Sequence, residues 1–242
     1  MPVSVWTPVP GSATGPGAGP VCALCGGRAG KARGPDTAQI ITAFSRPGEL
    51  VVIPDVRDGV LVATAAAAGR RVLCLASGPR SRERVLACLG DVDPQLSQLA
   101  EIRSGGPALL LKAGHPEAGR AALVITGGGD PEPGEPAAGP GVLYTACQRM
   151  LRPGGVLAVI TACTPGPGGL RDDPGEVMSR ARAAGLVYAQ HIVALHVPVT
   201  GSQITAVPKN DARPGEMAGL AAVHARVHSD FLVFTQPGGT PR

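Results

Sequence analysis

Short continuous runs of apolar residues recur along the central part of the chain and alternate with segments of helical spacing. The runs, which we predict to be strands, cover residues 49–54, 70–76, 107–113, 121–126 and 154–162. Because they lack strict alternation with polar residues, they are typical of parallel strands covered on both faces. The helices predicted between them cover residues 36–45, 59–69, 81–90 and 142–151. Repeated strand–helix units predict an α/β protein with a doubly wound sheet.

The pattern changes after residue 164. A Gly/Pro-rich loop leads to a predicted helix over 173–184, a strand over 185–197, a long polar insertion and a last strand over 229–236. We find no full crossover helix between the last two strands. Because a parallel pair needs such a crossover, the last strand is predicted to be antiparallel.

Glycine and proline dominate residues 1–35, without a periodic apolar pattern. We predict that this segment is a mobile arm or an extended segment laid on the domain. The folded domain is expected at residues 36–237, and a disordered tail at 238–242. A chain of 242 residues suits one α/β domain with such appendages.

Composition excludes some function classes. No apolar run approaches the roughly 18–20 residues that span a bilayer, so we expect no membrane segment. The amino-terminus lacks the basic start and apolar stretch of a secretion signal, which favours a cytoplasmic protein. The 22 Lys and Arg residues exceed the 18 Asp and Glu by only four, and the six aromatic residues offer few stacking platforms for bases. DNA therefore stays only a weak candidate partner.

The segment LRPGGVLAVIT, residues 151–161, places a helix end, a Pro-Gly-Gly turn and a buried strand in sequence. Gly154 and Gly155 permit backbone angles that other residues resist, and Pro153 helps to end the helix. This arrangement resembles the class I S-adenosylmethionine-dependent methyltransferases, whose fifth strand typically follows such a turn. The alternative is an ordinary helix–turn–strand unit of any α/β protein.

Residues 36–76 resemble one group of that superfamily, the DNA amino-methyltransferases, which methylate adenine N6 or cytosine N4. Pro54, Gly59, Ala65, Gly69 and Arg70 keep the residues of the family pattern. The resemblance implies a Rossmann-like sheet of about seven mostly parallel strands, with helices on both faces and an antiparallel last strand. It also implies a site for S-adenosylmethionine at the carboxyl ends of the strands.

Several cofactor-binding residues of this family are replaced. Its acidic residue at the end of the first strand corresponds to Ile53, with Asp55 two residues later, and its first loop glycine corresponds to Arg57. The acid that accepts hydrogen bonds from the cofactor ribose corresponds to Ala76, beside Ser77. Because alanine cannot accept that bond, we expect no bound cofactor, or S-adenosylmethionine only if the pocket survives. The vestigial cofactor-binding candidates are Pro54, Asp55, Asp58, Gly59, Ala76, Ser77 and Thr126.

The catalytic motif of the family is also replaced. Its tetrapeptide of a polar residue, two prolines and an aromatic residue follows the fourth strand, where it holds the target amine and stacks on the flipped base. Here the corresponding residues are three glycines and Asp130. Asp130 is either a lone catalytic carboxylate or a solvated turn former before Pro131.

These losses lead to three hypotheses. The first is a catalytically degenerate DNA-methyltransferase-like protein that serves as a binding or regulatory protein, with an unknown protein partner or as a homodimer. The second is an active S-adenosylmethionine-dependent methyltransferase that uses Asp55 or Asp58 for the cofactor amino group, Gly59 for close backbone approach and Asp130 near an unusual acceptor. The third is a DNA-binding module without catalysis.

Three further groups of residues invite a chemical interpretation. Cys22 and Cys25 have the spacing of one zinc-ribbon knuckle, but with two ligands the alternatives are a site within the monomer, a site shared across a dimer, or a metal-free thiol pair. His224 and His228 have helical i, i+4 spacing, which suits either one metal ion or a solvated helix end.

In the third group, Arg80, Arg82 and Arg84 cluster around the start of the helix predicted over 81–90, with Arg70 and Arg71 a few residues upstream. This group offers either a phosphate-binding patch or an ordinary solvated face. The remaining cysteines are expected to be buried free thiols: Cys74, Cys88, Cys147 and Cys163.

Overall fold

The structure is a computed structural model. It describes residues 2–6, 34–56, 59–127, 139–161, 164–166, 169–171, 174–195, 199–200, 203–204 and 228–238.

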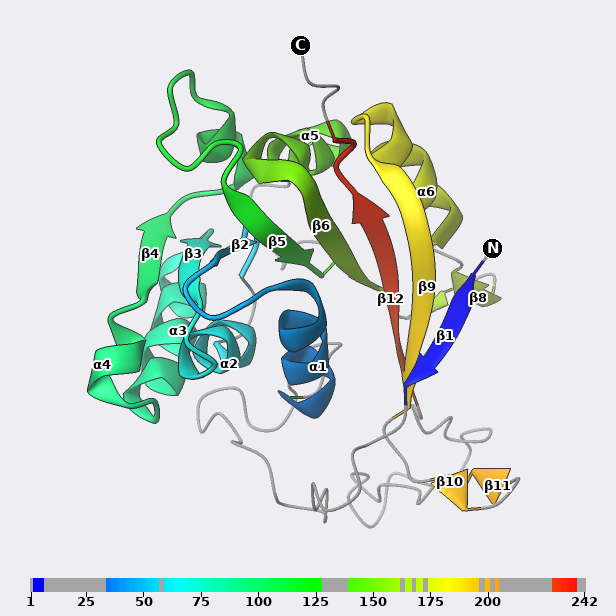
Figure 1. The fold of residues 1–242 in the computed structure, drawn as a ribbon, viewed down its shortest axis with the longest axis horizontal. Coiled ribbons are helices and arrows are strands. Elements are labelled where there is room, and N and C mark those ends of the chain that lie inside the picture. Colours follow the sequence, from blue (N-terminus) through cyan, green and yellow to red (C-terminus); the bar gives the residue numbers. More distant parts are fainter. Residues whose placement is uncertain are drawn as a thin grey trace.

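A central sheet of eight strands carries the fold, in the order β1-β9-β12-β6-β5-β2-β3-β4. Its strands are β1 (Val3–Trp6), β2 (Leu50–Ile53), β3 (Arg71–Ala76), β4 (Ala100–Ser104), β5 (Ala121–Thr126), β6 (Leu151–Thr161), β9 (Val187–Leu195) and β12 (His228–Thr235). Only β12 runs antiparallel to its neighbours, β6 and β9. In Figure 1 β4 and β1 form the two edges. The predicted doubly wound sheet and its antiparallel last strand are confirmed.

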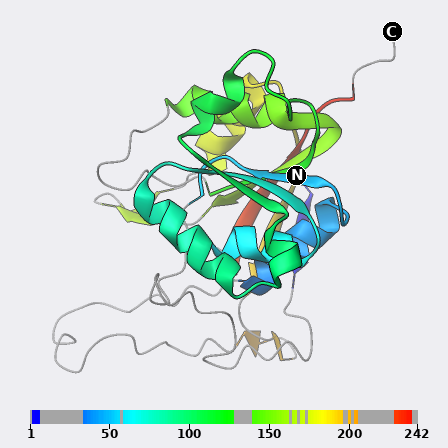
Figure 2. The same cartoon turned by 90° about the vertical axis from the view of Figure 1, so that its left-hand side faces the viewer.

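Helices cover both faces of this sheet, as Figure 2 shows. On one face α1 (Gly34–Phe44), α2 (Val60–Ala67) and α3 (Pro79–Gly90) bury a cluster that includes Ile41, Val85 and Phe231. On the other face α5 (Pro140–Met150), α6 (Pro174–Ala183) and the short 3-10 helix η1 (Pro107–Leu111) bury a second cluster. Successive strand residues join opposite clusters, because side chains of a strand alternate between the faces.

The remaining elements are small. Helix α4 (Pro94–Ser97) precedes β4, and its first turn is capped by Asp93, whose Oδ1 accepts a hydrogen bond from the backbone N–H of Gln95 at 2.8 Å. Two short hairpins stand apart from the main sheet: β7 (Thr164–Gly166) with β8 (Gly169–Arg171), and β10 (Val199–Thr200) with β11 (Gln203–Ile204). Among the described helices, none combines the length and the apolar character needed to cross a membrane.

The prediction of a strand over 107–113 is wrong. Residues Pro107–Leu111 form η1, in which Leu110 is fully buried and its neighbours are half-buried. The strand of this region is instead β4, which the sequence analysis missed. It is an edge strand, so charged residues such as Glu101 alternate with less exposed ones, and no continuous apolar run marks it.

The predicted Pro-Gly-Gly turn is present, within the residues assigned to β6. Gly154 has φ +72°, a left-handed angle that favours glycine. Its N–H donates to the carbonyl of Gln236 at 3.0 Å, and the N–H of Gln236 donates to the carbonyl of Gly155 at 2.8 Å. The turn is therefore tied to the end of β12, which follows it by about 80 residues in the sequence.

Two segments pair in ways that the sequence analysis did not assign. Within the predicted amino-terminal arm, Val3–Trp6 adds an eighth strand by pairing in parallel with β9, and Trp6 packs on the core. His228 opens β12 and pairs with Leu195, so the helical interpretation is wrong at this position.

Candidate functional site

The order of the strands defines one place where the chain changes direction. From β2 it continues to β3 and β4 on one side, and it later returns to β5 and β6 on the other side. The helices that follow β2 and β5, α2 and α5, therefore lie on opposite faces of the sheet. In open α/β sheets, ligands bind outside the carboxyl ends of the strands at such a point, and we refer to this place as the crevice. Two candidates from the sequence lie at this point: Asp55 follows β2, and Thr126 ends β5.

Asp55 and Thr126 are joined directly across the strand ends. The Thr126 hydroxyl donates a hydrogen bond to Asp55 Oδ1 at 2.6 Å. Thr126 is fully buried, whereas Asp55 is half-buried. The backbone N–H of Val56 then donates to the carbonyl of Leu75 in β3 at 3.0 Å. The Pro54–Val56 segment is thus anchored to both neighbours of β2.

Helix α5 places two titratable side chains close to this carboxylate. Burial raises the pKa of the Cys147 thiol well above its usual range, and the Asp55 charge raises it further. Burial also raises the pKa of Tyr144, with smaller contributions from Cys147 and Asp55 in the same direction. Cys147 is therefore a protonated thiol and not a nucleophile at neutral pH.

The ends of β2 and β3 are apolar. Ile53 and Ala76 are each 1% exposed, so neither position presents a polar side chain to the crevice. The carbonyl of Ala76 accepts a hydrogen bond from the N–H of Gly105 at 2.8 Å. Ser77 is half-buried beside it. Among the described residues just after β2 and β3, the acidic one is thus Asp55, two positions after the end of β2.

Gly59 serves the packing of two helices. A Cβ atom at this position would lie 2.4 Å from the carbonyl oxygen of Arg84 and 2.8 Å from the sulfur of Cys88, both in α3. The backbone at the start of α2 therefore touches the backbone of α3 directly. Close helix packing explains the glycine at this position, without a ligand.

Arg70 and Arg71 lie away from the other arginines of the candidate phosphate patch, Arg80, Arg82 and Arg84, which stay together in the first half of α3. Arg70 is buried, and its guanidinium donates to the carbonyls of Ser45 and Ala68 at 2.8 and 2.5 Å. Arg71 begins β3 and pairs with Glu117 at 3.1 Å, whereas Arg80 and Arg82 follow the other end of that strand. A strand of six residues separates the two groups by about 20 Å, so they do not form one patch.

A second polar pair, missed by the sequence analysis, lies at the same edge of the sheet. His191 Nε2 in β9 and Asp230 Oδ1 in β12 are 2.8 Å apart and partly buried. Asp230 pairs with Thr161 at the end of β6, and strand alternation puts both on the face covered by α5 and α6. In each strand, a polar residue among apolar ones was the signal in the sequence that could have pointed to this pair. The sequence does not give the register of the two strands, which brings His191 and Asp230 together.

Other candidates lie outside the described residues: Cys22, Cys25, Arg57, Asp58, Asp130, Cys163 and His224. Among the described residues, no group of three or more His, Cys, Asp or Glu side chains could hold a metal ion. Cys74, Cys88 and Cys147 are buried free thiols, as predicted.

A scan of protein-family profiles and a search of curated proteins give no match to this sequence. Solved structures do match. Geranyl diphosphate methyltransferase in complex with SAM is 11% identical, with 84% of this chain and 85% of that chain covered and a TM-score of 0.54. A Pyrococcus horikoshii protein named an RNA methyltransferase is 12% identical, with 84% and 83% covered and a TM-score of 0.53. The chain has the fold of the class I methyltransferases.

A further match has the same character. A Galdieria sulphuraria protein named a sarcosine dimethylglycine methyltransferase is 12% identical, with 84% of this chain and 83% of that chain covered and a TM-score of 0.51. The named enzymes differ in their acceptors, so the methyltransferase fold by itself specifies no substrate.

Replacing Gly59 by alanine should destabilise the protein by about 2 kcal/mol or more, because the new methyl group overlaps a backbone carbonyl that cannot rotate away. Gly90, at the end of α3, is the control: a Cβ there meets no atom within 4 Å. Gly90→Ala should be neutral or stabilising by up to about 1 kcal/mol. Urea unfolding of both variants measures the difference, and equal stabilities would show that the helices are not in backbone contact.

Replacing Thr126 by valine removes a hydroxyl but keeps the shape of the side chain. The Asp55 carboxylate then loses this donor, and the free energy of unfolding should fall by about 1–3 kcal/mol. In the control Thr145→Val, the lost hydroxyl bonds only the carbonyl of Gly141 on the exposed side of α5, at 2.9 Å. Its effect should stay within about 0.5 kcal/mol. A Thr126→Val variant as stable as the control would contradict the importance of the hydrogen bond.

Proposed function

We propose that this protein is a catalytically degenerate relative of the DNA amino-methyltransferases that acts by binding and not by methyl transfer. The observation that carries the proposal is Ala76, which is 1% exposed at the carboxyl end of β3. In Rossmann-type sites this strand end provides the carboxylate that accepts hydrogen bonds from the cofactor ribose.

The physical reason is the cost of an unmet hydrogen bond. A ribose hydroxyl placed against the Ala76 methyl group would leave water without gaining an acceptor, which costs about 1–3 kcal/mol for each such group. Ile53, at the end of β2, is equally apolar and buried. Asp55 does not replace the missing acid at β3, because its carboxylate lies beyond β2 and is engaged by Thr126 at the end of β5. The described residues therefore do not fit S-adenosylmethionine.

The second candidate is an active methyltransferase with rearranged cofactor contacts and an unusual acceptor. The observation in its favour is the row of polar groups at the carboxyl edge of the sheet, with Asp55 and Thr126 at one end and the pair of His191 and Asp230 at the other. A carboxylate–imidazole pair suits proton transfer, because the carboxylate fixes the orientation of the ring.

The binding partner in the leading proposal is another protein or a second copy of this chain, and the compartment is the cytoplasm. DNA is a less favoured partner, since Arg70 and Arg71 are separated along β3 from the arginines of α3, which reduces the candidate phosphate-binding patch to three side chains. Binding to DNA through phosphate contacts would weaken steeply as the salt concentration rises. Binding to a protein through an apolar surface would not.

Calorimetric titration of the purified chain with S-adenosylmethionine and with S-adenosylhomocysteine tests the proposal. We expect no binding heat and no shift of the melting temperature at millimolar ligand, because a ligand specific for the native state must stabilise it. Micromolar binding would show that a cofactor pocket survives and would favour the second candidate, and methyl transfer to any acceptor would overturn the proposal.

Two variants identify the site if binding is found. Asp55→Asn should weaken the binding at least tenfold if the crevice holds the ligand, because it removes the carboxylate next to β2. Asp93→Asn is the matched control, since Asp93 is an exposed cap of α4 away from the crevice. Equal affinities of the two variants would place the ligand elsewhere.

A further inference from the structure

Strand β1 forms a free edge of the central sheet. It is the outermost strand next to β9, and no described strand of the sheet lies beyond it, as Figure 1 shows. An edge strand presents a row of backbone N–H and C=O groups without partners, which makes it a template for pairing with a further strand. The residues of β1 therefore decide what can pair with this edge.

The backbone groups of Val3 and Val5 point away from the sheet. The N–H of His191 in β9 donates to the carbonyl of Pro2 at 3.1 Å, so the carbonyl of Pro2 faces β9. Along a strand, the hydrogen-bonding groups of successive residues point to alternate sides. The groups of Ser4 therefore face β9 as well, whereas the N–H and C=O groups of Val3 and Val5 face the free edge.

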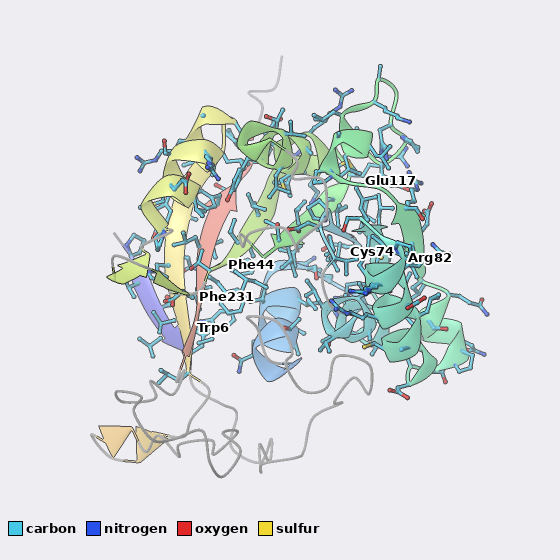
Figure 3. The ribbon with its side chains drawn as sticks, turned by 180° about the vertical axis from the view of Figure 1, so that it is seen from behind. Trp6, Phe44, Cys74, Arg82, Glu117 and Phe231 are labelled. Atoms are coloured by element: carbon cyan, nitrogen blue, oxygen red, sulfur yellow. The ribbon has the colours of Figure 1, made fainter. Side chains whose placement is uncertain are left out.

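The side chains of these two valines are exposed as well. Val3 is 59% exposed and Val5 is 62% exposed. Both lie on the face of the sheet opposite to Trp6, because side chains alternate along a strand. Trp6 packs on the buried cluster that contains Phe231, and Figure 3 shows both residues in the same region of the sheet. Strand β1 is thus held by Trp6 on one face and leaves two apolar side chains in water on the other.

The opposite edge of the sheet is protected by charge. There β4 carries Glu101 and Arg103, which form an ion pair at 2.6 Å with side chains that are 56% and 34% exposed. Charged side chains on an edge strand oppose pairing with another sheet. Strand β1, with the residues Val-Ser-Val-Trp, has no charged side chain. Pairing with a further strand is therefore favoured at β1 and not at β4.

Strand β1 is complementary to a second copy of itself. In an antiparallel pair related by a two-fold axis at Ser4, Val3 lies opposite Val5 of the second copy, and Val5 lies opposite Val3 of the second copy. Each of these opposed pairs exchanges both of its N–H···O bonds, so every outward-facing N–H and C=O group of the valines gains a partner. Opposed side chains lie on the same face, so the exposed valines of both copies pack against one another.

We propose that β1 is a dimerisation edge whose partner is a second copy of this chain. The two eight-stranded sheets then form one continuous sheet across the two-fold axis. Because a strand of four residues buries little area, we expect a dimer that dissociates on dilution. The proposal rests on the proposed function only for the role of the dimer as a binding protein, since the pairing itself needs no cofactor site.

Sedimentation velocity of the full chain tests this interface. The wild-type protein should change from monomer to dimer between low micromolar and submillimolar concentration. Val3→Lys combined with Val5→Lys should raise the dissociation constant about tenfold or more, because like charges then lie directly opposite each other. The control Leu86→Lys should dimerise as the wild type does, since Leu86 is 50% exposed on α3, which lies far from β1 in Figure 1.

A charge exchange separates this pairing from other causes of lost dimers. Val3→Glu combined with Val5→Glu should also prevent dimers on its own. An equal mixture of the lysine and glutamate variants should form heterodimers, since each lysine then lies opposite a glutamate. The fluorescence of Trp6, the one tryptophan of the chain, checks that β1 stays packed on the core in each variant.

Three results would overturn the proposal. A wild-type chain that stays monomeric at submillimolar concentration would leave another protein as the candidate for this edge. Dimers of the lysine variant as stable as those of the wild type would place the interface elsewhere, and a mixture of the charged variants that stays monomeric would exclude the pairing of the valines. None of these results bears on S-adenosylmethionine, whose binding the calorimetric titration tests separately.

Discussion

Burial of both faces of the parallel sheet is the constraint on which the rest of the structure depends. In β2, Val51 and Ile53 face the cluster under α1 and α2, while Leu50 and Val52 face the cluster under α5. All four residues of the strand must therefore be apolar. In β2, β3 and β5, which helices cover on both faces, polar side chains are consequently found at the ends of the strands, where the backbone leaves the sheet.

The two ends of the strands carry different chemistry. At the carboxyl ends, hydroxyl groups and carboxylates come from β5, β6, β12 and the turn after β2, which is where ligands of open α/β sheets bind. The last residues of β2 and β3, Ile53 and Ala76, are apolar and buried, and they interrupt this row. At the amino ends, Arg71 and Glu117 form an ion pair. About 20 Å of packed strand separates the two ends of the sheet.

Glycine has two distinct physical roles in this fold. Gly154 takes a left-handed backbone angle in the turn before the buried part of β6, which other residues adopt at a cost. Gly59 has an ordinary angle and is required because α3 leaves no space for a side chain. A glycine in a segment that resembles a cofactor loop can thus be required for helix packing and not for ligand binding. A family resemblance that rests on glycines is therefore weaker proof of a ligand than one that rests on carboxylates.

The sequence by itself determined the order of most helices and strands, the Pro-Gly-Gly turn and the antiparallel last strand, because hydrophobic spacing and turn residues act over a few neighbouring positions. It also showed the apolar residues Ile53 and Ala76 at the strand ends. It could not show β4, since an edge strand with charged residues has no apolar run. It could not show η1 either, because the apolar run PALLL has the pattern of a buried strand.

Only the tertiary structure decided which distant residues meet. Asp55 and Thr126 are 71 positions apart, and His191 and Asp230 are 39 apart, yet each pair forms a hydrogen bond. The space at Gly59 is likewise filled by another helix. These contacts depend on strand order and register, which arise from the packing of the whole sheet and have no local signature in the sequence.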